Sequence, residues 1–150
     1  MTQIKWSNKP NIQTLNDAYA TWNDYYRNNI NSKFMETFDD FLKIYKCCAV
    51  MKNVNISSVN NIENSRHTIN GKTPEEYYPK KDRPRGDSDI ESVKYYMKTK
   101  KYVSPIVIIN IDNRRIKLDG VHRIIAAKLR QSKIRICEII IPKIWKVLWQ

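Results

Sequence analysis

The 150-residue chain has few of the residues from which zinc sites and disulfide-linked scaffolds are built. It contains three cysteines, two histidines and no C-x-x-C pair, so a zinc site is not expected. Cys47 and Cys48 are adjacent and the third cysteine is Cys137. An odd number of cysteines, two of them neighbours, favours a reduced protein of the cytoplasm over a secreted, disulfide-linked one.

Long apolar runs are also missing from the sequence. The most apolar stretches, Ile106–Ile111 and Ile139–Ile141, are far shorter than the roughly 18 residues of a membrane-spanning helix. The N-terminal residues contain no apolar segment typical of a signal peptide. A hydrophobic fraction of 41% nevertheless excludes a disordered chain. We therefore expect a folded intracellular protein without membrane contact.

Positive charge is what the sequence has in excess, and the excess lies at one end. The formal net charge is +12, from 27 Lys and Arg against 15 Asp and Glu. Residues 90–150 hold 14 of the bases and four of the acids, whereas residues 1–41 hold four bases and five acids. This asymmetry favours an anionic partner: nucleic acid, the phosphates of a nucleotide, or anionic lipid.

Hydrophobic periodicity predicts an α+β fold with a small mixed β-sheet and packed helices, the first two forming an N-terminal hairpin. Helices are expected over residues 14–30, over 32–51 with Ser32 as N-cap, from Asp89 to about Lys101, from Val121 onward and after Pro142; strands are expected within 53–59 and over 106–111, 115–118 and 134–141, with a hairpin turn at Asp112-Asn113. We divide the chain into an N-terminal helical extension, residues 1–52, and a domain of residues 53–150 with a loop insertion at about 70–88.

The clearest chemistry lies where a strand, an Asp-Gly turn and a helix follow one another. The helix begins directly after Asp119-Gly120, and its first amide groups and dipole form an anion site. Gly120 lets the backbone approach a ligand closely, and Arg123 is able to clamp phosphate oxygens. Asp119 is a candidate ligand for Mg²⁺ or a partner of the arginine. The alternative is structural: Asp119 caps the helix, while His122 and Arg123 are surface residues.

This segment resembles the ParB/sulfiredoxin superfamily. The resemblance rests on Ser104-Pro-Ile-Val-Ile-Ile, a hairpin, Leu118-Asp-Gly-Val-His-Arg-Ile-Ile-Ala-Ala-Lys-Leu129 and a following strand; it covers roughly residues 53–141, and an Asn-rich segment ending at Arg66 is similar to the family's first box. It implies that ATP or CTP phosphates bind at the turn. Gly120, Val121, His122, Arg123 and Arg66 would then line the nucleotide site, and the Asp-Gly-x-His-Arg form is similar to that of the free-serine-kinase branch.

Two departures from the family pattern narrow this expectation. Sulfiredoxins carry a catalytic cysteine where this chain has Val121, so sulfinic-acid repair is not expected. Only nine residues follow Ile141, and because a helix-turn-helix domain needs more, a full chromosome-partition protein is not expected. Glu63 is the nearest acid in the first box and a candidate catalytic base, with the alternative that it is a solvated residue of a polar turn. Arg66 and His67 are candidates to face the same cleft.

Three functional hypotheses follow. The first is a nucleotide-dependent phosphotransferase or NTPase that uses ATP or CTP with Mg²⁺, in which Asp119 holds the metal and Glu63 is the base. The second is a ParB-like protein that binds or cleaves DNA or RNA. Its phosphate contacts would come from Lys94, Lys98, Lys100, Lys101, Arg114, Arg115, Lys117, Lys128, Arg130, Lys133 and Arg135. The third is a protein-interaction module that uses the N-terminal helices with Trp145 and Trp149.

Overall fold

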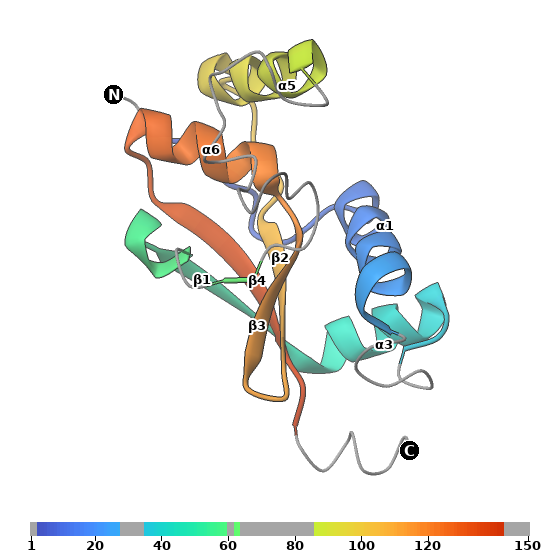
Figure 1. Cartoon of the computed structure of the whole chain (residues 1–150). Coiled ribbons are helices and arrows are strands. Elements are labelled where there is room, and N and C mark those ends of the chain that lie inside the picture. Colours follow the sequence, from blue (N-terminus) through green and yellow to red (C-terminus); the bar gives the residue numbers. More distant parts are fainter. Residues whose placement is uncertain (1–2, 28–34, 60–61, 64–85, 143–150) are drawn as a thin grey trace.

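The computed structural model describes residues 3–27, 35–59, 62–63 and 86–142 of the chain (Figure 1). Its elements follow in the order α1 (Ile12–Thr21), η1 (Trp22–Tyr26), α3 (Phe38–Cys48), β1 (Ala49–Val54), η2 (Ile56–Val59), α5 (Gly86–Lys98), β2 (Ile106–Ile111), β3 (Arg114–Asp119), α6 (Val121–Arg130) and β4 (Ile134–Ile140). The predicted α+β class is confirmed.

The four strands form one mixed sheet in the order β1-β4-β2-β3. β4 lies antiparallel to β1 and parallel to β2, and β2 and β3 form an antiparallel hairpin. Asp112 and Asn113 form the hairpin turn with φ values of 55° and 63°, the left-handed conformation that tight hairpins require and that Asp and Asn tolerate. The predicted hairpin is confirmed at these residues.

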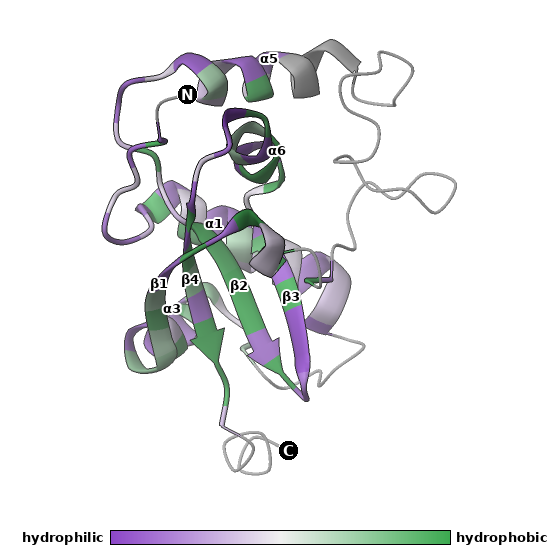
Figure 2. Cartoon of the chain, turned by 90° about the vertical axis from the view of Figure 1, so that its left-hand side faces the viewer, coloured by the Kyte–Doolittle hydropathy of each residue, from purple (hydrophilic) through white to green (hydrophobic). Residues whose placement is uncertain are grey.

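Helices cover both faces of the sheet (Figures 1 and 2). On one face, η1 and α3 bury Trp22 and Phe41 against alternate residues of the strands, including Val107, Ile109 and Ile139, and α1 adds Leu15 and Ala18 to this core. On the other face α6 packs against the intervening residues of β2 and β4, and α5 packs on the outer side of α6. The period-2 alternation of the strands thus supplies both cores.

Several predicted boundaries are wrong. The second helix begins after Thr37, whose side chain and Asp40 form a capping box, and it ends at Cys48, because Ala49–Val54 pair with β4 as an edge strand. The boundary drawn at residue 52 therefore falls inside strand β1. Residues 56–59 form a 3₁₀ turn, and α5 runs over Gly86–Lys98 rather than 89–101. Ser32, most of the 70–88 loop and the predicted C-terminal helix lie outside the described residues.

Candidate functional site

The turn between β3 and α6 depends on a glycine. Gly120 has a φ of 125°, and a Cβ atom there would lie 2.3 Å from Cγ2 of Ile106. No side chain of the described residues caps α6 at this N-terminus, because Gly120 at the N-cap position has none. The first-turn amides of the helix are therefore oriented as an anion site requires.

A cavity of about 350 Å³ lies at this helix end. Its lining includes all five consecutive residues predicted at the turn, Asp119, Gly120, Val121, His122 and Arg123. Three other segments complete the lining: Asn11, Gln13, Thr14 and Asp17 at the start of α1, Tyr95 and Tyr96 of α5, and Tyr102, Val103 and Ser104 before β2. The N-termini of α1 and α6 thus contribute to the same cavity.

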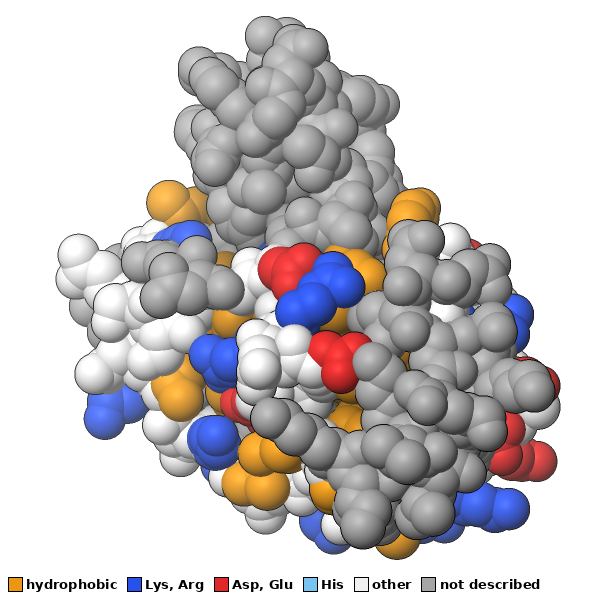
Figure 3. All heavy atoms as spheres, turned by 60° about the horizontal axis from the view of Figure 1, so that its bottom comes forward, with side chains coloured by type: hydrophobic (Ala, Val, Ile, Leu, Met, Phe, Trp, Pro, Cys, Tyr) orange, Lys and Arg blue, Asp and Glu red, His pale blue; other side chains and the backbone are white. Residues whose placement is uncertain are grey.

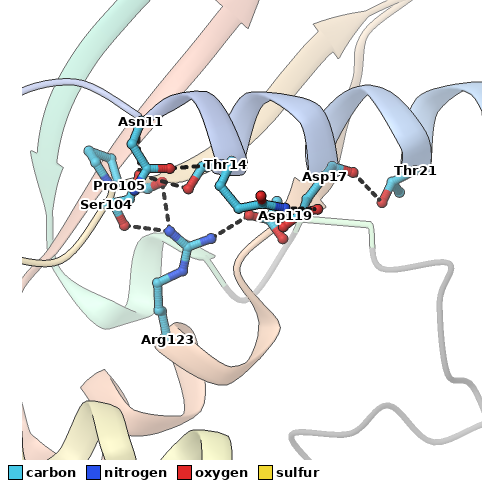
Figure 4. Close-up of polar contacts among 9 residues, drawn as sticks. Asn11, Thr14, Asp17, Thr21, Ser104, Pro105, Asp119 and Arg123 are labelled. Atoms are coloured by element: carbon cyan, nitrogen blue, oxygen red, sulfur yellow. Dashed lines mark hydrogen bonds and ion pairs between the residues drawn. The ribbon is translucent and has the colours of Figure 1, made fainter.

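Arg123 connects two strands from within this site (Figure 4). Its Nη1 donates to the carbonyl oxygens of Ser104 and, at 3.1 Å, Pro105, and its Nη2 donates to Oδ2 of Asp119 at 2.6 Å. The Arg123 side chain is only 6% exposed. Arg123 therefore fixes the start of β2 and the end of β3 relative to α6, and Asp119 is its ion-pair partner, one of the two roles considered for that carboxylate.

The α1 side of the cavity was not identified from the sequence. Asn11 accepts a hydrogen bond from the Thr14 amide through Oδ1 at 2.8 Å, and Thr14 donates to Oγ of Ser104 at 2.8 Å. Asp17, on the exposed side of α1, accepts from Gln13 at 3.0 Å. The site therefore has two carboxylates, Asp17 and Asp119. Asn11 carries the sequence signal of an N-cap, but nothing local in the sequence shows that α1 begins beside the N-terminus of α6.

Glu63 does not line the cavity. Its backbone extends the free edge of β3, and its carboxylate binds Arg114 through two contacts of 2.8 Å. The hydrogen bond from Arg114 lowers the pKa of the Glu63 carboxyl more than partial burial raises it. A carboxylate with both oxygens bound and a lowered pKa is a weak general base. Arg66 and His67 lie outside the described residues.

The bases assigned to nucleic-acid binding fall into two groups. Arg115 binds the buried Glu138 at 2.8 Å, Arg114 binds Glu63, and Lys117 and Arg130 are buried. On the face at the hairpin end of the sheet, the basic side chains that are described lie intermixed with acidic and hydrophobic ones (Figure 3). The lysines that remain outward-facing are Lys94, Lys98, Lys100, Lys101 and Lys133, with Lys128 and Arg135 half-buried.

The cysteines do not contribute to the cavity. Cys137 is fully buried in the sheet, and burial raises the pKa of its thiol to about 12, so it is protonated at neutral pH. All three cysteines are free. Among the described residues no group of three or more His, Cys, Asp or Glu is placed to hold a metal ion. No helix in the same residues is long and apolar enough to cross a membrane.

Comparisons of the chain with protein-family models, with curated proteins and with solved structures gave no match.

Proposed function

We propose that the cavity at the N-terminus of α6 binds the phosphate groups of a nucleotide, ATP or CTP, as its Mg²⁺ complex. The observation that carries the proposal is a cavity of about 350 Å³ at the uncapped start of α6, lined by Asp119 to Arg123. Backbone amides at such a start bind phosphate oxygens without any cationic side chain. The resemblance of this turn to the ParB/sulfiredoxin superfamily supports the same ligand class.

The charges of the lining support a metal complex rather than a free nucleotide. Asp17 and Asp119 face one arginine, and the guanidinium of that arginine already pairs with Asp119. A free polyphosphate would therefore meet a lining of negative formal charge. Mg²⁺ reverses this balance, and in proteins it is commonly held by one or two carboxylates together with phosphates and water. Asp17 and Asp119 would supply those carboxylates.

Phosphoryl transfer to an acceptor, or NTP hydrolysis, is the activity that such a site would support, because these reactions depend on positioning and charge neutralisation. Glu63 has no part in this proposal, since it does not line the cavity and is bound to Arg114. His122, half-buried in the first turn of α6, also lines the cavity and would contact a phosphate bound there. A cytoplasmic location, where nucleotides and Mg²⁺ are available, belongs to the same proposal.

A thermal-shift panel with ATP, CTP, adenosine and cytidine, each with and without Mg²⁺, tests this function. At a ligand concentration of about 100 Kd, binding should raise the Tm by about 5 °C or more, for one of the nucleotides and only with Mg²⁺. Asp17→Asn keeps the acceptor for Gln13 but removes one carboxylate charge, and should weaken Mg²⁺-nucleotide binding about tenfold or more. Asp39→Asn, on the exposed side of α3, is the matched control.

The proposal is wrong if neither nucleotide shifts the Tm. It is also wrong if the nucleosides shift it as much as the nucleotides do, because the phosphates would then contribute nothing. Equal binding by wild type and Asp17→Asn, with loss of binding in neither, would remove Asp17 from the metal site.

A further inference from the structure

α5 presents two different faces. Val93, Tyr96 and Met97 pack against α6. The opposite side carries Glu91, Lys94, Tyr95, Lys98 and Thr99, which line an open groove on the surface of the protein. Their spacing places these residues on one stripe of the helix. The inner stripe fixes α5 to the domain, and the outer stripe is presented to solvent.

The lysines of this outer stripe continue into the segment that follows the helix. Lys94, Lys98, Lys100 and Lys101 are all exposed, and none has an ion pair or a side-chain hydrogen bond with any described residue. The nearest acid along this stretch is Glu91. The four ammonium groups therefore form a local excess of positive charge that the described fold does not neutralise.

Two tyrosine rings lie among these lysines. Tyr95 is 54% exposed and Tyr102 is 75% exposed, the largest exposed fraction of any large hydrophobic residue in the described chain. Tyr95 is held against Tyr96 in an edge-to-face contact, with ring centroids 5.2 Å apart. Neighbouring exposed apolar groups on a soluble protein are typical of an interaction site. Rings placed between unpaired cations are typical of surfaces on which nucleobases stack.

We infer that single-stranded nucleic acid binds along this α5 surface, defined as Glu91, Lys94, Tyr95, Lys98, Lys100, Lys101 and Tyr102. The lysines contact backbone phosphates, and bases stack on Tyr95 and Tyr102. A single strand fits better than a duplex because the bases of a duplex are stacked on one another, so their faces are not open to stacking on these rings. The α5 surface adjoins the nucleotide cavity and shares Tyr95 and Tyr102 with its wall, whereas none of the four lysines lines that cavity.

Fluorescence anisotropy with a labelled oligothymidylate of about 12 nucleotides, a length in the range bound by small single-strand-binding domains, tests the inference. With four phosphate contacts, log K should fall with log salt with a slope of about −2.8. Lys98→Ala/Lys101→Ala should weaken binding and reduce the magnitude of the slope by about 1.4. Lys43→Ala/Lys46→Ala removes the same charge from the exposed side of α3 and should leave the slope unchanged.

The tyrosines separate base stacking from simple charge attraction. Tyr102→Ala should weaken binding about tenfold or more, whereas Tyr102→Phe keeps the ring and should bind like wild type. The inference is overturned if the strand does not bind at low salt, or if Tyr102→Ala binds as tightly as Tyr102→Phe. It is also overturned if a duplex of the same length, heparin or vesicles of anionic lipid bind with equal affinity, since any polyanion would then suffice.

Discussion

The C-terminal part contains arginines that hold the fold together and, on the α5 surface, exposed lysines that bind no described residue through their side chains. Arg123, Arg130 and Arg115 each bind two or more oxygens of distant segments. The lysines of the α5 surface have no such partners among the residues that the structure describes. The planar fork of a guanidinium fits several acceptors at once, whereas an ammonium on a flexible stem is easily left in water. The net charge of the C-terminal part therefore overstates the number of cations that are available to bind an anion.

Replacing Arg123 is the strongest way to test the structural half of this comparison. Arg123→Met keeps an apolar stem but removes the donors to Ser104, Pro105 and Asp119. We expect the free energy of unfolding to fall by about 3 kcal/mol, because the half-buried Asp119 carboxylate loses its ion pair with Arg123 and two carbonyls lose a charged donor. Urea denaturation should show a lower midpoint at an unchanged m-value.

Arg135→Met is the matched control for this substitution. Arg135 is half-buried and donates to Asn8 and Asn53 through exposed hydrogen bonds of 3.1 and 2.9 Å. Its loss should cost about 1 kcal/mol or less. Equal destabilisation by the two substitutions would contradict the view that Arg123 is the residue that joins β2, β3 and α6.

Glu138 contributes less to the free energy of unfolding than Arg123 does, and its contribution depends on pH. The side chain is 3% exposed and binds Arg115, Lys52 and Asn110. Burial raises the pKa of this carboxyl, but the hydrogen bonds from Arg115 and Asn110 and the charges of Arg115 and Lys52 outweigh burial, so the net pKa is lowered. Because the folded-state pKa lies below the unfolded value, the stabilisation is complete above the unfolded pKa and is lost as pH falls through the folded pKa.

Glu138→Gln should therefore cost about 2 kcal/mol at pH 7, because a charged hydrogen-bond acceptor becomes neutral. The difference from wild type should shrink as the pH falls below about 4.3, the usual pKa of an unfolded glutamate. Urea denaturation between pH 7 and pH 3 measures both quantities. A difference that stays constant over this range would show that the ionised carboxylate contributes nothing to stability.

The sequence predicted the C-terminal half of the fold well because its signals are local. The Asp112-Asn113 turn, the β-branched run of β2 and the start of α6 after Gly120 are each determined within a few residues. β1 was misassigned because Ala49–Met51 continue the apolar pattern of α3, and their extended state depends on pairing with Ile139 to Cys137. Long-range pairing of this kind overrides local propensity.

The candidate site could be predicted only in its contiguous part. Asp119 to Arg123 form one run of sequence, so their proximity was certain before the structure. The contributions of Asp17, Tyr95 and Tyr102 depend on how α1 and α5 pack around α6. The pairing of Arg123 with the carbonyls of Ser104 and Pro105 is equally a tertiary property, and it gives a residue expected at a phosphate a buried position instead.

Of these substitutions, Lys98→Ala should change the free energy of unfolding least, so it tests binding separately from stability. Lys98 lies in the last turn of α5, where its charge interacts favourably with the helix dipole, but it also lies four residues after Lys94, a like-charge pair that is unfavourable. Each effect is worth a few tenths of a kcal/mol and they oppose each other, so the free energy of unfolding should stay within about 0.5 kcal/mol of wild type. A loss above about 1 kcal/mol would place Lys98 among the structural cations. An unchanged stability together with weaker binding of the single-stranded oligonucleotide would separate the exposed lysines from the structural arginines by function. The same domain would then tolerate the loss of a lysine but not of Arg123.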